Sequence, residues 1–91
     1  MLGRFFVITI NYKDGLKNDA VQKALGAFDW MRFASNTYYV YSYITNAKAL
    51  YDLIRPVLDP KDDVLVVEAN LANRQGWASK VAVEWLQQAR T

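Results

Sequence analysis

The sequence predicts an α+β fold with the element order strand, helix, strand, strand, helix, strand, followed by a third helix. Two observations favour it. The chain has 91 residues, which is the size of one small domain. Four short segments have the apolar or aromatic composition of strands, and in three others apolar residues recur every third or fourth residue. Two helices separated by a strand pair pack most simply on one face of an antiparallel sheet.

The first strand is expected at residues 4–12, in the centre of the sheet. Its odd and even side chains are both largely apolar, so we expect it to be buried on both faces. The strongly polar Asn11 stands near its end. A turn is expected at residues 13–15, where Gly15 can supply a positive φ.

The next helix is expected within residues 16–28, with one apolar stripe facing the sheet: Val21, Ala24, Leu25 and Phe28. A further helix is expected from about residue 46, with Thr45 as its N-cap. Because Pro56 has no amide hydrogen, the last turn of this helix is expected to kink or fray. The predicted buried stripe comprises Leu50, Leu53, Ile54 and Val57.

The other strands are expected at residues 29–35, 37–44 and 63–69. The first two form a hairpin through a short link at residues 35 and 36. The expected strand order, 4-1-3-2, makes residues 1–70 a ferredoxin-like βαββαβ domain with an antiparallel sheet and both helices on one face.

A loop and a C-terminal helix extend this minimal fold over residues 71–91, with the helix expected at residues 77–90. The predicted stripe of this helix comprises Ala78, Val81, Ala82 and Trp85. Large aromatic side chains are seldom left in water. Trp77 and Trp85 therefore predict that the helix packs on its own domain or on a dimer partner.

The composition excludes several kinds of chemistry. The sequence has neither cysteine nor histidine, which removes disulfides, thiol nucleophiles, the usual zinc sites and a histidine base. We expect no cofactor, and a metal site would need oxygen ligands suited to Mg²⁺. No apolar run approaches the roughly 20 residues of a membrane span, and no signal-peptide pattern is seen, so we expect a cytoplasmic protein without membrane association.

Three segments carry a resemblance to a known superfamily: Leu-Ile-Arg-Pro-Val-Leu at 53–58, Asp-Asp-Val-Leu-Val-Val-Glu-Ala at 62–69, and Glu84-Trp85-Leu86. With the small size and the apolar first strand, they resemble the SinR-like branch of the small CRISPR-associated Cas-two and VapD superfamily. This resemblance covers nearly the whole chain. It implies a ferredoxin-like protomer that forms a homodimer and, in some relatives, a metal-dependent endonuclease acting on RNA or DNA.

The resemblance also implies where a catalytic acid would stand. In those nucleases an acidic residue closes the first strand, and two copies of it hold one divalent ion. The matching position here is the uncharged Asn11, which argues against catalysis. The predicted topology collects other polar residues at the same rim of the sheet: Lys13, Asp14, Asn36, Asp62 and Asp63.

These rim residues allow two interpretations. Asp62 and Asp63 are candidate Mg²⁺ ligands and, with Asn11 and Asp14, candidate catalytic residues. Alternatively, the aspartates are turn formers, a common role of Asp. A further carboxylate, Glu68, is expected to pair with Arg4 or to reach solvent rather than to act as a catalytic acid.

Tyrosines on the third strand suggest a binding surface. Tyr39, Tyr41 and Tyr43 share one face, and a row of aromatic side chains on an open sheet can stack unpaired bases. With Lys13 and Arg32 they are candidate nucleic-acid-binding residues. The alternatives are a dimer face or a platform covered by the C-terminal helix. The formal net charge of +2 arises from dispersed basic residues, which favours a mixed solvated surface over a phosphate-binding stripe.

We therefore expect a homodimeric, nucleic-acid-associated or protein-interaction module without nuclease activity. The alternative is a Mg²⁺-dependent endoribonuclease of the Cas-two and VapD type, in which rim carboxylates replace the missing acid. A third hypothesis is a regulatory protein, such as an antitoxin or a phage-encoded inhibitor, that acts by binding a protein partner.

Overall fold

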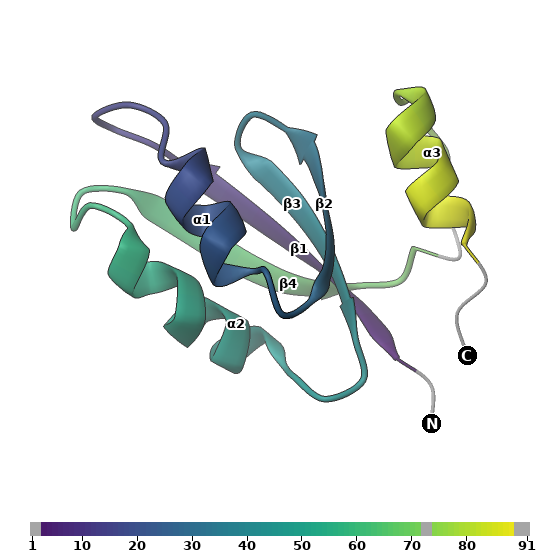
Figure 1. Cartoon of the computed structure of the whole chain (residues 1–91), viewed down its shortest axis with the longest axis horizontal. Helices are drawn as coiled ribbons and strands as arrows, with labels where there is room; N and C mark the ends of the chain where they lie inside the picture. The colour runs from purple at the N-terminus through teal and green to yellow at the C-terminus, as the bar shows by residue number, and fades with distance from the viewer. Residues whose placement is uncertain (1–2, 72–73, 89–91) are drawn as a thin grey trace.

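The computed structural model describes residues 3–71 and 74–88 of the chain. Its antiparallel sheet has the strand order β2-β3-β1-β4 and is formed by β1 (Arg4–Asn11), β2 (Asp29–Ala34), β3 (Thr37–Ser42) and β4 (Asp63–Ala69). Helices α1 (Asn18–Ala24) and α2 (Ala47–Ile54) cover one face, while α3 (Lys80–Gln87) stands apart from them near β2 (Figure 1). The predicted ferredoxin-like fold and strand order are confirmed.

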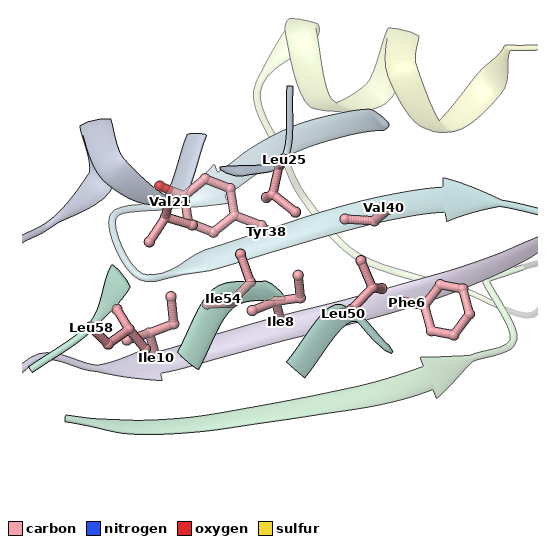
Figure 2. Packing of buried hydrophobic residues seen from close by; sticks show 10 residues of the cluster. All are labelled: Phe6, Ile8, Ile10, Val21, Leu25, Tyr38, Val40, Leu50, Ile54 and Leu58. Atoms are coloured by element: carbon pink, nitrogen blue, oxygen red, sulfur yellow. The ribbon is translucent and has the colours of Figure 1, made fainter. Parts of the chain in front are cut away.

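The main core lies between the sheet and the helices α1 and α2. Phe6, Ile8 and Ile10 of β1 are at most 1% exposed and point toward the helices (Figure 2). The alternate residues of β1 differ: Val7 is half-buried and Thr9 is exposed. The expected burial of β1 on both faces is therefore wrong, because α1 and α2 cover only one face of the sheet.

The start of α2 differs from the prediction. Asn46, not Thr45, is the N-cap, and its side-chain oxygen accepts the backbone N–H of Ala49 at 2.8 Å. This bond satisfies one of the donors that a helix start leaves unpaired. Leu53 is 39% exposed, so it does not belong to the buried stripe, whose fully buried member in this turn is Ile54.

The end of α2 follows the prediction. The helix tightens after Ile54 into a 3-10 turn at Arg55–Val57, which contains Pro56. The turn after β1 is also confirmed, since Gly15 has a φ of +104°, a conformation that favours glycine. β3 ends at Ser42, two residues earlier than expected, so Tyr43 lies outside the strand and is exposed.

Helix α3 is shorter than predicted. It begins after Ser79, whose hydroxyl accepts the backbone N–H of Ala82 at 3.2 Å. Trp77 precedes the helix and is 98% exposed, and Val81 is 70% exposed, so the expected burial of these two side chains is wrong. The predicted end of the helix near residue 90 lies outside the described residues. None of the helices in the described part of the chain has the length and apolar composition of a membrane crossing.

Candidate functional site

Asp62 lies at the rim of the sheet where β4 begins, and its side chain is fully enclosed. One carboxylate oxygen accepts the backbone N–H of Lys13 at 2.8 Å, and the other accepts the backbone N–H of Asp59 at 2.9 Å. Lys17 Nζ lies 3.0 Å from the second oxygen. The hydrogen bond from Lys13 is the main cause that holds the pKa of Asp62 below its usual range.

Asp63 is the exposed neighbour at the same rim. Its Oδ2 accepts a hydrogen bond from Asn11 Nδ2 at 3.2 Å and lies 3.3 Å from Lys13 Nζ. The side chain of Asp63 is 70% exposed. The carbonyl of Asn36 accepts the backbone N–H of Ile10 at 2.9 Å, which places the hairpin link beside the end of β1.

The rim thus brings together most of the residues predicted there: Asn11, Lys13, Asn36, Asp62 and Asp63. The remaining candidate, Asp14, lies exposed in the turn after β1. Lys17, which the sequence analysis did not single out, contributes the cation nearest to the buried carboxylate. It was missed because its role depends on a residue 45 positions away.

These residues do not fit a divalent metal site. Residues 3–71 and 74–88 contain no group of three or more carboxylates that could hold a metal. Both oxygens of Asp62 already accept N–H donors, and Asp63 faces an amide donor and an ammonium group. A metal ion would have to displace these groups. The bonds of Asp62 instead clamp the loop after β1 to the turn before β4, as the turn-former interpretation expects.

The predicted pair of Arg4 and Glu68 is confirmed. Arg4 Nη1 lies 3.1 Å from Glu68 Oε1, and Arg4 Nη2 donates to the carbonyl of Thr45 at 2.8 Å. Both side chains of the ion pair are about half exposed. The contact therefore links the start of β1 to the end of β4 and to the loop before α2.

The tyrosines of β3 divide between the two faces of the sheet. Tyr38 faces α1 and α2 and is fully buried, whereas Tyr39 and Tyr41 face the other side and are half-buried. The ring centroid of Tyr41 lies 5.0 Å from that of Phe5. The ring of Tyr39 stacks on Phe33, with centroids 5.1 Å apart.

Helix α3 covers the β2 and β3 half of this second face. Trp85 is 7% exposed, and its Nε1 donates to Asp29 Oδ1 at 2.8 Å. The indole ring also meets Phe5 edge-on, with centroids 5.9 Å apart, and clusters with Met31 and Ala82. Tyr41 packs against this cluster, so a row of three open tyrosines is not formed.

The other candidate binding residues do not join Tyr39 and Tyr41 on one surface. Arg32 is paired in register with Tyr38 and so lies on the side of α1 and α2. Lys13 lies at the rim and pairs with Asp63. The structure therefore separates the basic candidates from the aromatic ones.

The part of the second face that lies beyond Phe5, on β1 and β4, is left exposed by the described residues. It consists of two cross-strand pairs, Val7 with Val67 and Thr9 with Leu65. Leu65 is 60% and Val67 46% exposed. We call these four residues the open sheet surface. Contiguous apolar side chains on an exposed surface commonly mark an interaction site.

Trp77 lines a groove of about 290 Å³ beside α3. Besides Trp77, the groove is lined by side chains of β2, β3 and α3, including Phe33, Tyr39, Val83 and Leu86. Almost the whole indole of Trp77 remains in contact with water.

Two features of the molecule escaped the sequence analysis. Asn18 Oδ1 accepts hydrogen bonds from the hydroxyls of Tyr12 at 2.9 Å and Tyr38 at 2.7 Å. Burial, with Tyr38 nearby, raises the pKa of Tyr12 to about 12. No local pattern marks this cluster. Nor does a local pattern mark the exposure of Leu65 and Val67, because four successive apolar residues at 64–67 are typical of a buried strand.

Comparison with protein-family models finds no matching family, and comparison with curated proteins finds no similar sequence.

Proposed function

We propose that the protein is a non-catalytic protein-interaction module that forms a homodimer through the open sheet surface. The observation that carries the proposal is the exposure of Leu65 and Val67 beside Val7, on the half of the sheet that α3 leaves uncovered. Removing apolar surface from water contributes about 25 cal/mol per Å². A partner that covers this surface is therefore stabilised by ordinary apolar burial.

The charges on this face favour a protein partner over a nucleic acid. The residues of β1 and β4 on the face of the open sheet surface include no lysine or arginine: Phe5, Val7, Thr9, Asn11, Asp63, Leu65, Val67 and Ala69. Binding to nucleic acid depends on cations that meet the phosphates. The face instead offers apolar side chains with a single carboxylate at its rim.

The rim supports the non-catalytic part of the proposal. The carboxylate of Asp62 is enclosed and engaged by N–H donors, and the exposed Asp63 is paired with Lys13. The sequence resemblance to the Cas-two and VapD superfamily agrees with the homodimer, since it implies two copies, and the neutral Asn11 stands where the nucleases of that superfamily carry an acid.

The mass of the protein in solution tests the proposal. Light scattering after gel filtration should give about twice the 10.5 kDa of one chain. Leu65→Glu and Val67→Glu should shift the protein to the monomer, because either change places a charge on the surface that we expect to be buried. Ile44→Glu is the matched control, since Ile44 is apolar, 80% exposed and lies in the loop after β3.

A wild-type monomer at high concentration would contradict the homodimer. Equal loss of the dimer in Ile44→Glu would show that added charge alone, and not the position of Leu65 or Val67, causes dissociation.

A further inference from the structure

β4 has an edge position but the composition of a central strand. Within the described residues, the sheet ends at β4, which pairs only with β1. Residues 64–67 are Val-Leu-Val-Val, apolar on both faces, with Val64 and Val66 half-buried toward the helices. A continuous apolar run is typical of strands that have a neighbour on each side. The composition of β4 therefore indicates a missing neighbour.

The free edge of β4 lacks the features that usually block strand addition. Its seven residues stay in one uninterrupted register with β1, without a bulge, a proline or a lysine. Its two charged residues stand near its ends and are engaged, Asp63 by Lys13 and Glu68 by Arg4. Native edges are commonly protected by bulges, prolines or charges.

The opposite edge of the same sheet is protected. β2 has a register shift between Arg32 and Ala34, and it carries the charged residues Asp29 and Arg32. It is also contacted by α3, whose Trp85 donates to Asp29. A bulge and charged side chains hinder pairing with another strand. The two edges of one sheet thus differ, and only β4 is suited to accept a strand.

We propose that the free edge of β4 pairs antiparallel with β4 of a second copy of this chain, which joins the two four-stranded sheets into one continuous sheet. The inference rests on the proposed homodimer and adds how the two copies meet: edge to edge, with Leu65 and Val67 of the open sheet surface at the seam. The backbone N–H and C=O groups along β4 would then be paired on both sides, as in a central strand.

The sequence of β4 is complementary to itself in this arrangement. A two-fold axis at Val66 pairs all seven residues of the strand, and opposite residues then lie on the same face. The opposed pairs are Leu65 with Val67, Val64 with Glu68, and Asp63 with Ala69. No pair places like charges opposite each other, a contact that would destabilise the ladder.

The same pairing brings together the exposed apolar side chains of β4. Leu65 of one copy lies directly opposite Val67 of the other, at the Cα separation of about 4.5 to 5.5 Å that antiparallel pairs have. These side chains are the most exposed apolar residues of β4 in the single chain. In the joined sheet they form one cluster of four, two from each copy.

Cysteine cross-linking tests this register cleanly, because the natural chain has no cysteine. We would mix Leu65→Cys and Val67→Cys in equal amounts, oxidise them and analyse the products on non-reducing gels. A mass tag on one variant distinguishes the mixed dimer from the two homodimers. Directly opposed residues satisfy the Cα separation of a disulfide, about 4.4 to 6.8 Å, whereas a residue and its own copy lie on a diagonal about 7 to 8 Å apart. The mixed dimer should exceed either homodimer about tenfold.

Val7→Cys is the control for the edge geometry. Val7 is on the same face but on β1, so in the joined sheet the two copies of it are three strand spacings apart, about 14 Å, and should not cross-link. Before oxidation, light scattering gives the dimer fraction of each reduced variant, and cross-linking is compared at equal dimer fraction.

The outcomes separate this inference from the proposed function. A wild-type monomer contradicts both. If the wild type is a dimer but the mixture of Leu65→Cys and Val67→Cys cross-links no better than Val7→Cys, the edge pairing is contradicted. The proposed homodimer is not contradicted by that result. Equal cross-linking in the mixture and in each variant alone contradicts the register centred on Val66. Mixed-dimer formation well above all controls is the result that we expect.

Discussion

The buried carboxylate of Asp62 fixes the rim of the sheet through bonds to two loops. It accepts the backbone N–H groups of Lys13 and Asp59 and pairs with Lys17. The neighbouring side chain of Asp63 is largely exposed. Two adjacent aspartates thus have different roles: one holds the turn before β4, and the other carries a surface ion pair. Their sequence alone does not distinguish them, because the difference lies in what covers each side chain.

The lowered pKa of Asp62 predicts how stability depends on pH. Because its folded-state pKa lies below the ordinary value of about 3.9, the carboxylate stabilises the fold above that value, and this contribution is lost as pH falls through the folded-state pKa. Asp62→Asn should lower the urea midpoint at pH 7, and its difference from wild type should shrink as the pH falls below about 4.

Asp63→Asn is the matched control, since its side chain is 70% exposed and its ion pair is open to solvent. We expect its effect at pH 7 to be the smaller of the two, because exposed ion pairs contribute little. A difference between wild type and Asp62→Asn that stays constant from pH 7 to pH 2.5 would contradict the assigned role.

At the scale of the elements, α3 depends on one side chain. Trp85 supplies the contacts of this helix with Phe5 and the hydrogen bond to Asp29, and Ser79 caps the start of the helix. Apolar side chains of α3 that are exposed, such as Val81, contribute little to the packing of the helix on the sheet. The cover of the β2 and β3 half of the sheet therefore rests mainly on Trp85.

The two tryptophans of this segment form a natural pair for a stability measurement. Trp85→Ala should reduce the free energy of unfolding by about 3 to 5 kcal/mol, the usual cost of deleting a buried aromatic side chain. Trp77→Ala should change it by less than about 0.5 kcal/mol, because Trp77 is 98% exposed. Urea unfolding followed by circular dichroism measures both, and equal losses would show that the burial of Trp85 is not what holds the helix.

At the scale of the whole molecule, polar and apolar surfaces are segregated. The rim at the end of β1 gathers carboxylates, amides and lysines, whereas the open sheet surface is largely apolar. The ion pairs thus stand at the rim of the face, and the surface through which we propose that two copies meet begins beside them.

An assay of the purified protein tests the absence of nuclease activity. We expect no cleavage of labelled RNA or DNA in Mg²⁺ or Mn²⁺, and no saturable binding in fluorescence anisotropy at low salt, where phosphate contacts are strongest. Cleavage that disappears in Asp62→Ala or Asp14→Ala would contradict the proposal. Asn11→Asp supplies a carboxylate at the position of the superfamily's acid. The same cleavage assay of this variant shows whether that carboxylate alone is enough for nuclease activity.

The sequence by itself determined the element order, the strand order and much of the core. A short apolar run after a turn located β4 at the residues where the structure has it, and apolar stripes with the helix period located α1 and α2, because these patterns are local. The rim was also predictable, since the topology brings the end of β1 and the start of β4 to one side of the sheet.

Only the tertiary structure decided which surfaces are covered. The choice of Asn46 over Thr45 as a cap, the exposure of Trp77 and the enclosure of Asp62 all depend on the positions of distant residues. The sequence equally did not show that α3 leaves Leu65 and Val67 exposed. An apolar residue in a strand looks the same in sequence whether another element covers it or not, so the open edge and face of β4 became visible only in the folded chain.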